Sequence, residues 1–94
     1  MIIYIAGRIT GDPDYKAKFD KAAKRLSAKG HVVLTPSMLP LGLDYDDYMH
    51  IDFAMIDVAD AVYFLKGYKS SNGAMKEWHY AMWINKEMMY ERRE

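Results

Sequence analysis

Cysteine is absent from this chain of 94 residues, and its absence excludes disulfides, a thiol nucleophile and thiolate metal ligands. The three histidines, His31, His50 and His79, are scattered without a partner at ligand spacing. We therefore expect neither a metal site nor a cofactor. A charge excess of one sign is also lacking, since 13 basic and 13 acidic residues cancel. This balance gives no electrostatic reason to expect a nucleic-acid or membrane partner.

Long apolar runs are lacking as well, and no segment approaches the length of a membrane span. The N-terminal MIIYIAG is too short for the apolar region of a signal peptide and lacks a leading basic segment. Together with the absence of cysteine, these features lead us to expect a cytoplasmic protein. The length favours one domain, which we expect to cover residues 1–94.

What the sequence does contain is an alternation of short apolar segments with amphipathic ones. We expect Asp12 to cap the first helix, with Pro13 at its first position. The element order predicts an α/β fold, a three-layer sandwich with a small parallel sheet of Rossmann-like type and strand order 2-1-3-4. Ligands of such sheets bind at the carboxyl ends of the strands. The expected strands are 2–6, 31–34, 61–65 and 87–90, the expected helices 13–29, 44–57 and 71–85, and the tail 91–94 should be frayed.

The loop AGRITG places Gly7 and Gly11 between a strand and a helix. Glycine permits close backbone approach, and the N–H groups at the start of a helix can bind phosphate. The loop is neither a Walker loop nor a GxGxxG fingerprint, so a plain tight turn remains the alternative. Arg8 could clamp a phosphate or a ribose with its guanidinium, or stand as a solvated surface charge.

Two acids fall on helix faces that should be buried. On a helical wheel, Asp52 lies with Tyr48 on the core-facing side of the second expected helix, and Glu77 is central on the inner face of the third. Two converging carboxyl groups suit chemistry at an anomeric carbon, or hydrogen bonding to ribose hydroxyls. The alternatives are that Asp52 caps a neighbouring loop, or that the pair shares a proton in a purely structural role.

The third expected helix also carries a second apolar face, formed by Met75, Trp78 and Met82. A surface helix needs only one apolar face, so the second favours a subunit interface with two-fold symmetry. A stacking platform for a nucleobase is the alternative. The sequence therefore predicts more than a monomer.

Three blocks, YIAGRITG, DYMHIDFAMIDVADAVYFL and SNGAMKEWHYA, resemble those of the small nucleoside 2-deoxyribosyltransferase-like proteins of bacteriophages. Within that group the chain looks most like the phage anti-defence family that blocks the Thoeris system. That family sequesters cyclic ADP-ribose-type signals without cleaving them, and relatives also bind cyclic dinucleotides. The resemblance implies a homotetramer in the cytoplasm of an infected bacterial host. In the related transferases and N-glycosidases, the position of Glu77 is the nucleophile and an acid near Asp52 assists it.

The chain departs from the transferase pattern, because Arg8 stands where those enzymes commonly carry proline. Our first hypothesis is therefore a non-catalytic protein that sequesters a cyclic nucleotide, in which phosphate, ribose and base are each held. The second is a deoxyribosyltransferase or nucleotide N-glycosidase with Glu77 as nucleophile and Asp52 as its partner, and the third is a structural module. The expected ligand-binding residues are Ala6, Gly7, Arg8, Tyr48, Asp52, Ser70, Ser71, Asn72, Gly73, Glu77 and Trp78.

Overall fold

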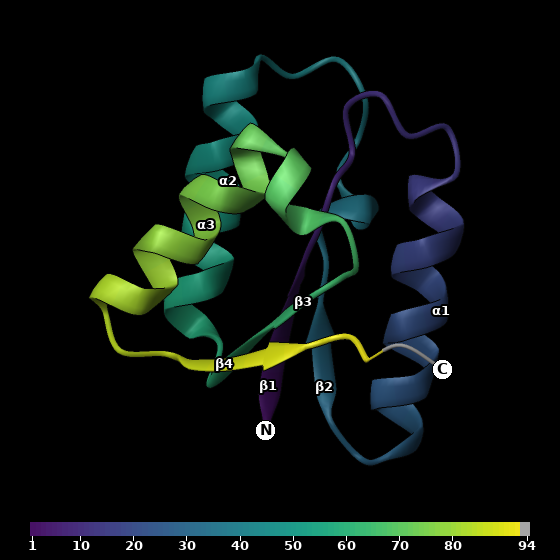
Figure 1. The fold of residues 1–94 in the computed structure, drawn as a ribbon, viewed down its shortest axis with the longest axis vertical. Coiled ribbons are helices and arrows are strands. Elements are labelled where there is room, and N and C mark those ends of the chain that lie inside the picture. The colour runs from purple at the N-terminus through teal and green to yellow at the C-terminus, as the bar shows by residue number, and fades with distance from the viewer. Residues whose placement is uncertain (93–94) are drawn as a thin grey trace.

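Four short strands form one parallel sheet in the order β2-β1-β3-β4, which confirms the predicted strand order (Figure 1). The computed structural model describes residues 1–92. The third helix, which was expected over residues 71–85, is shorter at both ends. The strands are β1 (Ile2–Ala6), β2 (Val32–Leu34), β3 (Ala61–Phe64) and β4 (Glu87–Tyr90), and the helices are α1 (Tyr15–Ala28), α2 (Tyr45–Val58) and α3 (Asn72–Trp83).

The helices cover both faces of the sheet, with α1 on one face and α2 and α3 on the other (Figure 1). This division follows from the two-residue period of a strand, because successive side chains of β1 point to opposite faces. Ile3 and Ile5 pack in the core that contains Phe19 of α1, whereas Tyr4 and Ala6 belong to the core beneath α2 and α3. The predicted three-layer α/β sandwich is therefore confirmed.

Strand β1 lies in the interior of the sheet and determines where the loops meet. It pairs in parallel with β2, where Ile2 is opposite Val32, and with β3, where Ile3 is opposite Ala61. The carboxyl ends of these parallel strands therefore lie at one edge of the sheet. The loops that follow β1, β2 and β3 all begin at that edge, which is where ligands of such sheets bind.

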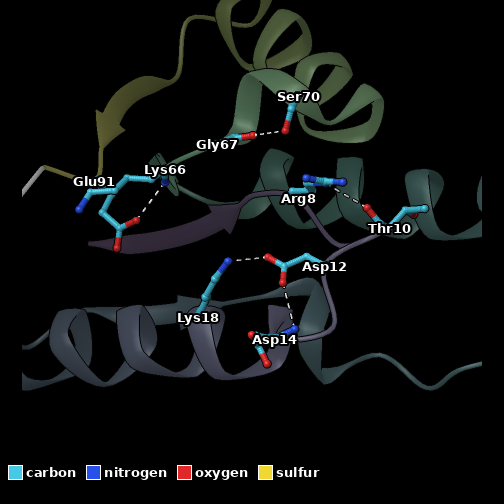
Figure 2. Close-up of polar contacts among 9 residues, drawn as sticks. All are labelled: Arg8, Thr10, Asp12, Asp14, Lys18, Lys66, Gly67, Ser70 and Glu91. Carbon is cyan, nitrogen blue, oxygen red and sulfur yellow. Dashed lines mark hydrogen bonds and ion pairs between the residues drawn. The ribbon is translucent and has the colours of Figure 1, made fainter.

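Helix α1 begins later than predicted, because Asp12 does not cap it. Instead Asp12 Oδ1 accepts a hydrogen bond from the N–H of Asp14 at 2.9 Å, and Oδ2 accepts one from Lys18 Nζ at 2.7 Å (Figure 2). An aspartate that bonds the backbone two residues onward makes a local turn that competes with the helix. The helix consequently starts at Tyr15 rather than at Pro13.

The end of β4 is held in place, so the predicted frayed tail is wrong for Glu91. Its Oε1 accepts a hydrogen bond from the N–H of Lys66 at 2.9 Å (Figure 2). Its Oε2 accepts one from Arg25 Nη2 at 3.3 Å. This carboxylate ties the end of β4 to the loop after β3 and to α1, while Arg93 and Glu94 of the expected tail lie outside the described residues.

Candidate functional site

A cavity of about 200 Å³ opens at the carboxyl edge of the sheet. Its walls come from the loop after β1, the segment between β2 and α2, the first half of α2 and the first turns of α3. The side chains expected to bind a ligand are thus brought together from elements that are distant in the sequence. Six of those expected residues line the cavity: Gly7, Tyr48, Asp52, Ser71, Gly73 and Glu77.

Two buried carboxyl groups line this cavity, and a tyrosine supports one of them. Only 6% of Asp52 and 3% of Glu77 is exposed. Tyr4, which is fully buried on β1, donates its hydroxyl to Glu77 Oε2 at 2.5 Å. We call Tyr4, Asp52 and Glu77 the acid cluster. Since they come from β1, α2 and α3, the cluster forms only where both helices pack on the same face of the sheet.

The helical period explains why both acids point inward, and their predicted burial is confirmed. Asp52 lies between the buried residues Met49 and Ile56, at spacings of three and four. Glu77 has the same spacing to buried alanines on either side of it along α3. Helix α3 begins at a fixed point because Ser71 Oγ accepts a hydrogen bond from the N–H of Ala74 at 3.1 Å. This cap helps to hold Glu77 at the carboxyl edge of the sheet.

Burial raises the pKa of every member of the acid cluster. Burial and then the charge of Asp52 raise the pKa of Glu77 well above its usual value. Burial raises the pKa of Asp52 to about 6, although its neighbours Glu77 and Tyr4 lower it in part. Burial, followed by the charges of the two carboxylates, raises the pKa of Tyr4 well above its usual value. Burial therefore favours the protonated form of each group in the acid cluster more than exposure to water would.

One oxygen of the acid cluster is buried without a hydrogen-bond partner. Among the described residues, Asp52 Oδ1 is the one buried side-chain oxygen or nitrogen that lacks a hydrogen-bond partner. Leaving a buried acceptor unpaired costs roughly 1–3 kcal/mol, and a ligand that donates a hydrogen bond to it removes that cost. Hydroxyl and N–H groups are donors of the required kind. The arrangement can therefore bind a ligand that brings hydroxyl groups to the two carboxyl groups.

Aromatic and apolar side chains form most of the cavity wall. Apart from Tyr48, they were not among the expected ligand-binding residues. Tyr45 shares the inward side of α2 with Asp52, so a periodic signal existed for it. The irregular segment before α2 has no such period. Across residues 1–92, no lysine or arginine lines the cavity. The additional lining residues include Ile9, Thr10, Tyr15, Leu39, Pro40, Leu41, Tyr45 and Met49.

Comparison with known proteins places the chain in a family. Residues 1–90 match the family model described as "Domain of unknown function (DUF4406)". The chain belongs to this family. No curated protein matches the DUF4406 chain. Its fold, in contrast, does have a match among solved structures.

Among solved structures, the DUF4406 chain is similar to a "2-desoxiribosyltransferase from Leishmania mexicana". The two structures agree with a TM-score of 0.74 at 23% sequence identity, and the match covers 95% of this chain. It covers 62% of that protein, so this chain spans less than two thirds of its length. At this identity the likeness shows the fold alone, which this chain shares with that protein.

Two residues that were expected to bind phosphate donate hydrogen bonds to nearby backbone carbonyl groups. Arg8 is exposed, and its Nε donates a hydrogen bond to the carbonyl oxygen of Thr10 at 3.2 Å (Figure 2). The hydroxyl of Ser70 donates to the carbonyl oxygen of Gly67 at 2.8 Å (Figure 2). Neither side chain lines the cavity. Both lie in loops at its edge of the sheet, so they can reach only a ligand that extends beyond the cavity.

The other expected residues outside the cavity lining are Ala6, Asn72 and Trp78. Ala6 is buried in β1, and Asn72 is exposed at the start of α3. Trp78 is half-buried, and its Nε1–H donates to the hydroxyl of Tyr90 at 3.0 Å. The indole is therefore engaged with β4 and packs against the core that contains Tyr4.

Two further properties of the described residues bear on what the chain can bind. No group of three or more histidine, aspartate or glutamate side chains in residues 1–92 gathers in a way that could hold a metal ion. None of the helices in this range combines the length and the apolar character that crossing a bilayer requires.

Proposed function

We propose that the cavity binds a nucleotide through its ribose and base and holds it without cleavage. The observation that carries this proposal is Asp52 Oδ1, a buried acceptor without a partner in a cavity that Glu77 also lines. Ribose hydroxyl groups donate hydrogen bonds to such acceptors. The rings of Tyr45 and Tyr48 line the same cavity and offer an aromatic surface on which a base can stack.

The nucleotide we propose is a cyclic ADP-ribose-type signal, or a cyclic dinucleotide, of the kind that the resemblance of the three sequence blocks implies. A volume of about 200 Å³ lies below the 300–1,000 Å³ typical of sites that enclose a small molecule. Since no cation of residues 1–92 lines the cavity, the phosphates would lie outside it. Arg8 stands in the loop after β1, and Lys76 Nζ lies 4.9 Å from the centre of the Tyr45 ring. We expect these two cations to meet the phosphates outside the cavity.

We infer that a second copy of the chain packs against the end of α3. Met82 and Trp83 at the end of α3 are 49% and 82% exposed. Large apolar side chains exposed together favour an interface between subunits. We therefore propose a homo-oligomer, a tetramer by the resemblance, that acts in the cytoplasm of an infected bacterium and removes the signal that activates Thoeris defence.

Retention without cleavage is supported by the raised pKa of Glu77. A carboxyl group attacks an anomeric carbon as a carboxylate. Burial and the charge of Asp52 raise the pKa of Glu77 well above its usual value, which favours the protonated form of the group. A neutral carboxyl group still donates and accepts hydrogen bonds. It can hold a ribose hydroxyl while being a poor nucleophile.

The test is to incubate the protein with a cyclic ADP-ribose isomer, denature the complex and analyse the nucleotide by mass spectrometry. We expect the intact nucleotide in stoichiometric amount, and at least tenfold weaker binding by Asp52→Asn. Asp46→Asn is the matched control, because Asp46 is exposed on the same helix, and should bind normally. Release of free base over many turnovers would refute retention. Absence of any nucleotide binding would support a structural module instead.

A second candidate function is glycosidic bond transfer or hydrolysis, and the short hydrogen bond from Tyr4 to Glu77 favours it. This bond, 2.5 Å long, fixes one carboxyl oxygen and offsets part of the rise that burial and the charge of Asp52 cause in the pKa of Glu77. In that reaction the ionised Glu77 would attack C1′ as the bond to the base breaks, and the base would leave with a proton that the protonated Asp52 donates. Water or a second base would then displace Glu77. The same mass-spectrometric experiment distinguishes the two functions.

A further inference from the structure

The segment between β2 and α2 forms part of the cavity wall, and the hydroxyl of Tyr48 bonds to it twice. Pro40 and Leu41 line the cavity, as does Tyr48 itself. Tyr48 Oη donates a hydrogen bond to the carbonyl oxygen of Pro40 at 2.6 Å and accepts one from the N–H of Leu43 at 3.2 Å. We call residues 40–43 the wall segment.

The wall segment has little else to hold it. Leu41 is 82% exposed and Leu43 is 37% exposed, so neither side chain is packed into the core. Gly42 adopts a positive φ of 101°, a conformation that favours glycine and lets the chain turn back. Within the described residues, both hydrogen bonds of the wall segment run to Tyr48 Oη. A single phenol therefore fixes the outer wall of the cavity.

Tyr48 also lies one helical turn before Asp52 on α2, and residues four apart share a helix face. The same helix thus presents the buried acceptor Asp52 Oδ1 and the phenol that fixes the wall segment of the same cavity. We propose that Tyr48 is a positioning residue: its hydroxyl holds the wall segment at the mouth of the cavity and thereby slows the escape of a bound ligand. The ligand part of this inference rests on the proposed function, whereas the positioning part does not.

The first test is amide hydrogen exchange in the ligand-free protein, with Tyr48→Phe as the variant. Removal of the hydroxyl deletes both hydrogen bonds, so the amide of Leu43 should exchange on the order of tenfold faster. The amides of the sheet should be unaffected. Tyr80→Phe is the matched control, because its hydroxyl donates to Asp57 Oδ1 at 2.5 Å outside the cavity. Unchanged exchange at Leu43 in Tyr48→Phe, or equally fast exchange there in Tyr80→Phe, would overturn the positioning role.

The second test measures the dissociation rate of a cyclic ADP-ribose isomer. We expect Tyr48→Phe to release this probe several-fold faster with little change in its association rate, and Tyr80→Phe to behave as the unmodified protein does. An unchanged dissociation rate in a variant whose wall segment is loosened would overturn the role in retention. If the unmodified protein binds no nucleotide, the proposed function fails, and the exchange experiment decides the role of Tyr48 by itself.

Discussion

Replacing Asp52 by asparagine is expected to stabilise the folded protein at neutral pH while weakening nucleotide binding. Burial raises the pKa of Asp52 from 3.8 to about 6. Between these two values the folded state binds more protons than the unfolded state does. The free energy of unfolding therefore falls as the pH rises from about 4 through about 6. Above that range the folded protein carries a buried charge that the asparagine variant lacks.

The size of the effect follows from the two pKa values. The difference between 3.8 and about 6 corresponds to roughly 3 kcal/mol at pH 7.5. Solvent that enters the open cavity screens part of this charge, and the new amide must itself find partners. We therefore expect Asp52→Asn to raise the free energy of unfolding at pH 7.5 by about 1–2 kcal/mol.

The assay is urea denaturation of the unmodified protein, Asp52→Asn and the control Asp46→Asn at intervals from pH 4 to pH 8. Each variant differs from the unmodified protein by a single titratable group. A difference in the free energy of unfolding between the two therefore reports on the substituted acid. The gain in Asp52→Asn should be greatest at the upper end and vanish near pH 4. Any slope that remains in this variant is attributed in part to Glu77, whose pKa is also raised. Parallel curves for Asp52→Asn and the unmodified protein, or a variant that is less stable at pH 7.5, would refute the reasoning.

Two further substitutions test the framework of the site and its assembly. Lys86 Nζ donates to the carbonyl oxygens of Asp57 at 3.0 Å and Ala59 at 2.7 Å, which closes the end of α2. Lys86→Met should lower stability by about 1–2 kcal/mol, and calorimetry should show a lower Tm, whereas an unchanged Tm would contradict the role of this lysine. Met82→Glu should lower the molar mass found by light scattering, since a charge is added to the exposed end of α3; an assembly of unchanged mass would rule out that interface.

The sequence was sufficient for the sheet order and for the inward orientation of Asp52 and Glu77, because both depend on regular periods. It was not sufficient for Tyr4, which resembles any apolar residue in the strand IIYIA. A signal was nevertheless present, since a buried phenol needs a hydrogen-bond partner and Tyr4 lies on the face of β1 that α2 and α3 cover.

Positions in irregular segments could not be predicted in the same way. Arg8 was expected at a phosphate, which stays a prediction; its Nε–H donates to a carbonyl group in its own turn, and the sequence did not predict that bond. Tyr48 was expected to stack on a base, and whether its ring does so remains a prediction. Its bonds to the wall segment depend on how that segment folds back. Local hydrogen bonds of this kind leave no periodic pattern in the sequence from which they could be predicted.

The interior position of β1 has a consequence for how the chain folds during synthesis. β1 is made first, yet one of its edges stays open until β2 is available and the other until β3 follows. An apolar strand must therefore wait for partners that are distant in the chain, which slows folding and favours a single cooperative step. Glu77 arrives later still, so no nascent chain that ends before α3 can form the acid cluster. The carboxyl edge of the sheet therefore lacks its complete pair of buried acids until α3 has been made.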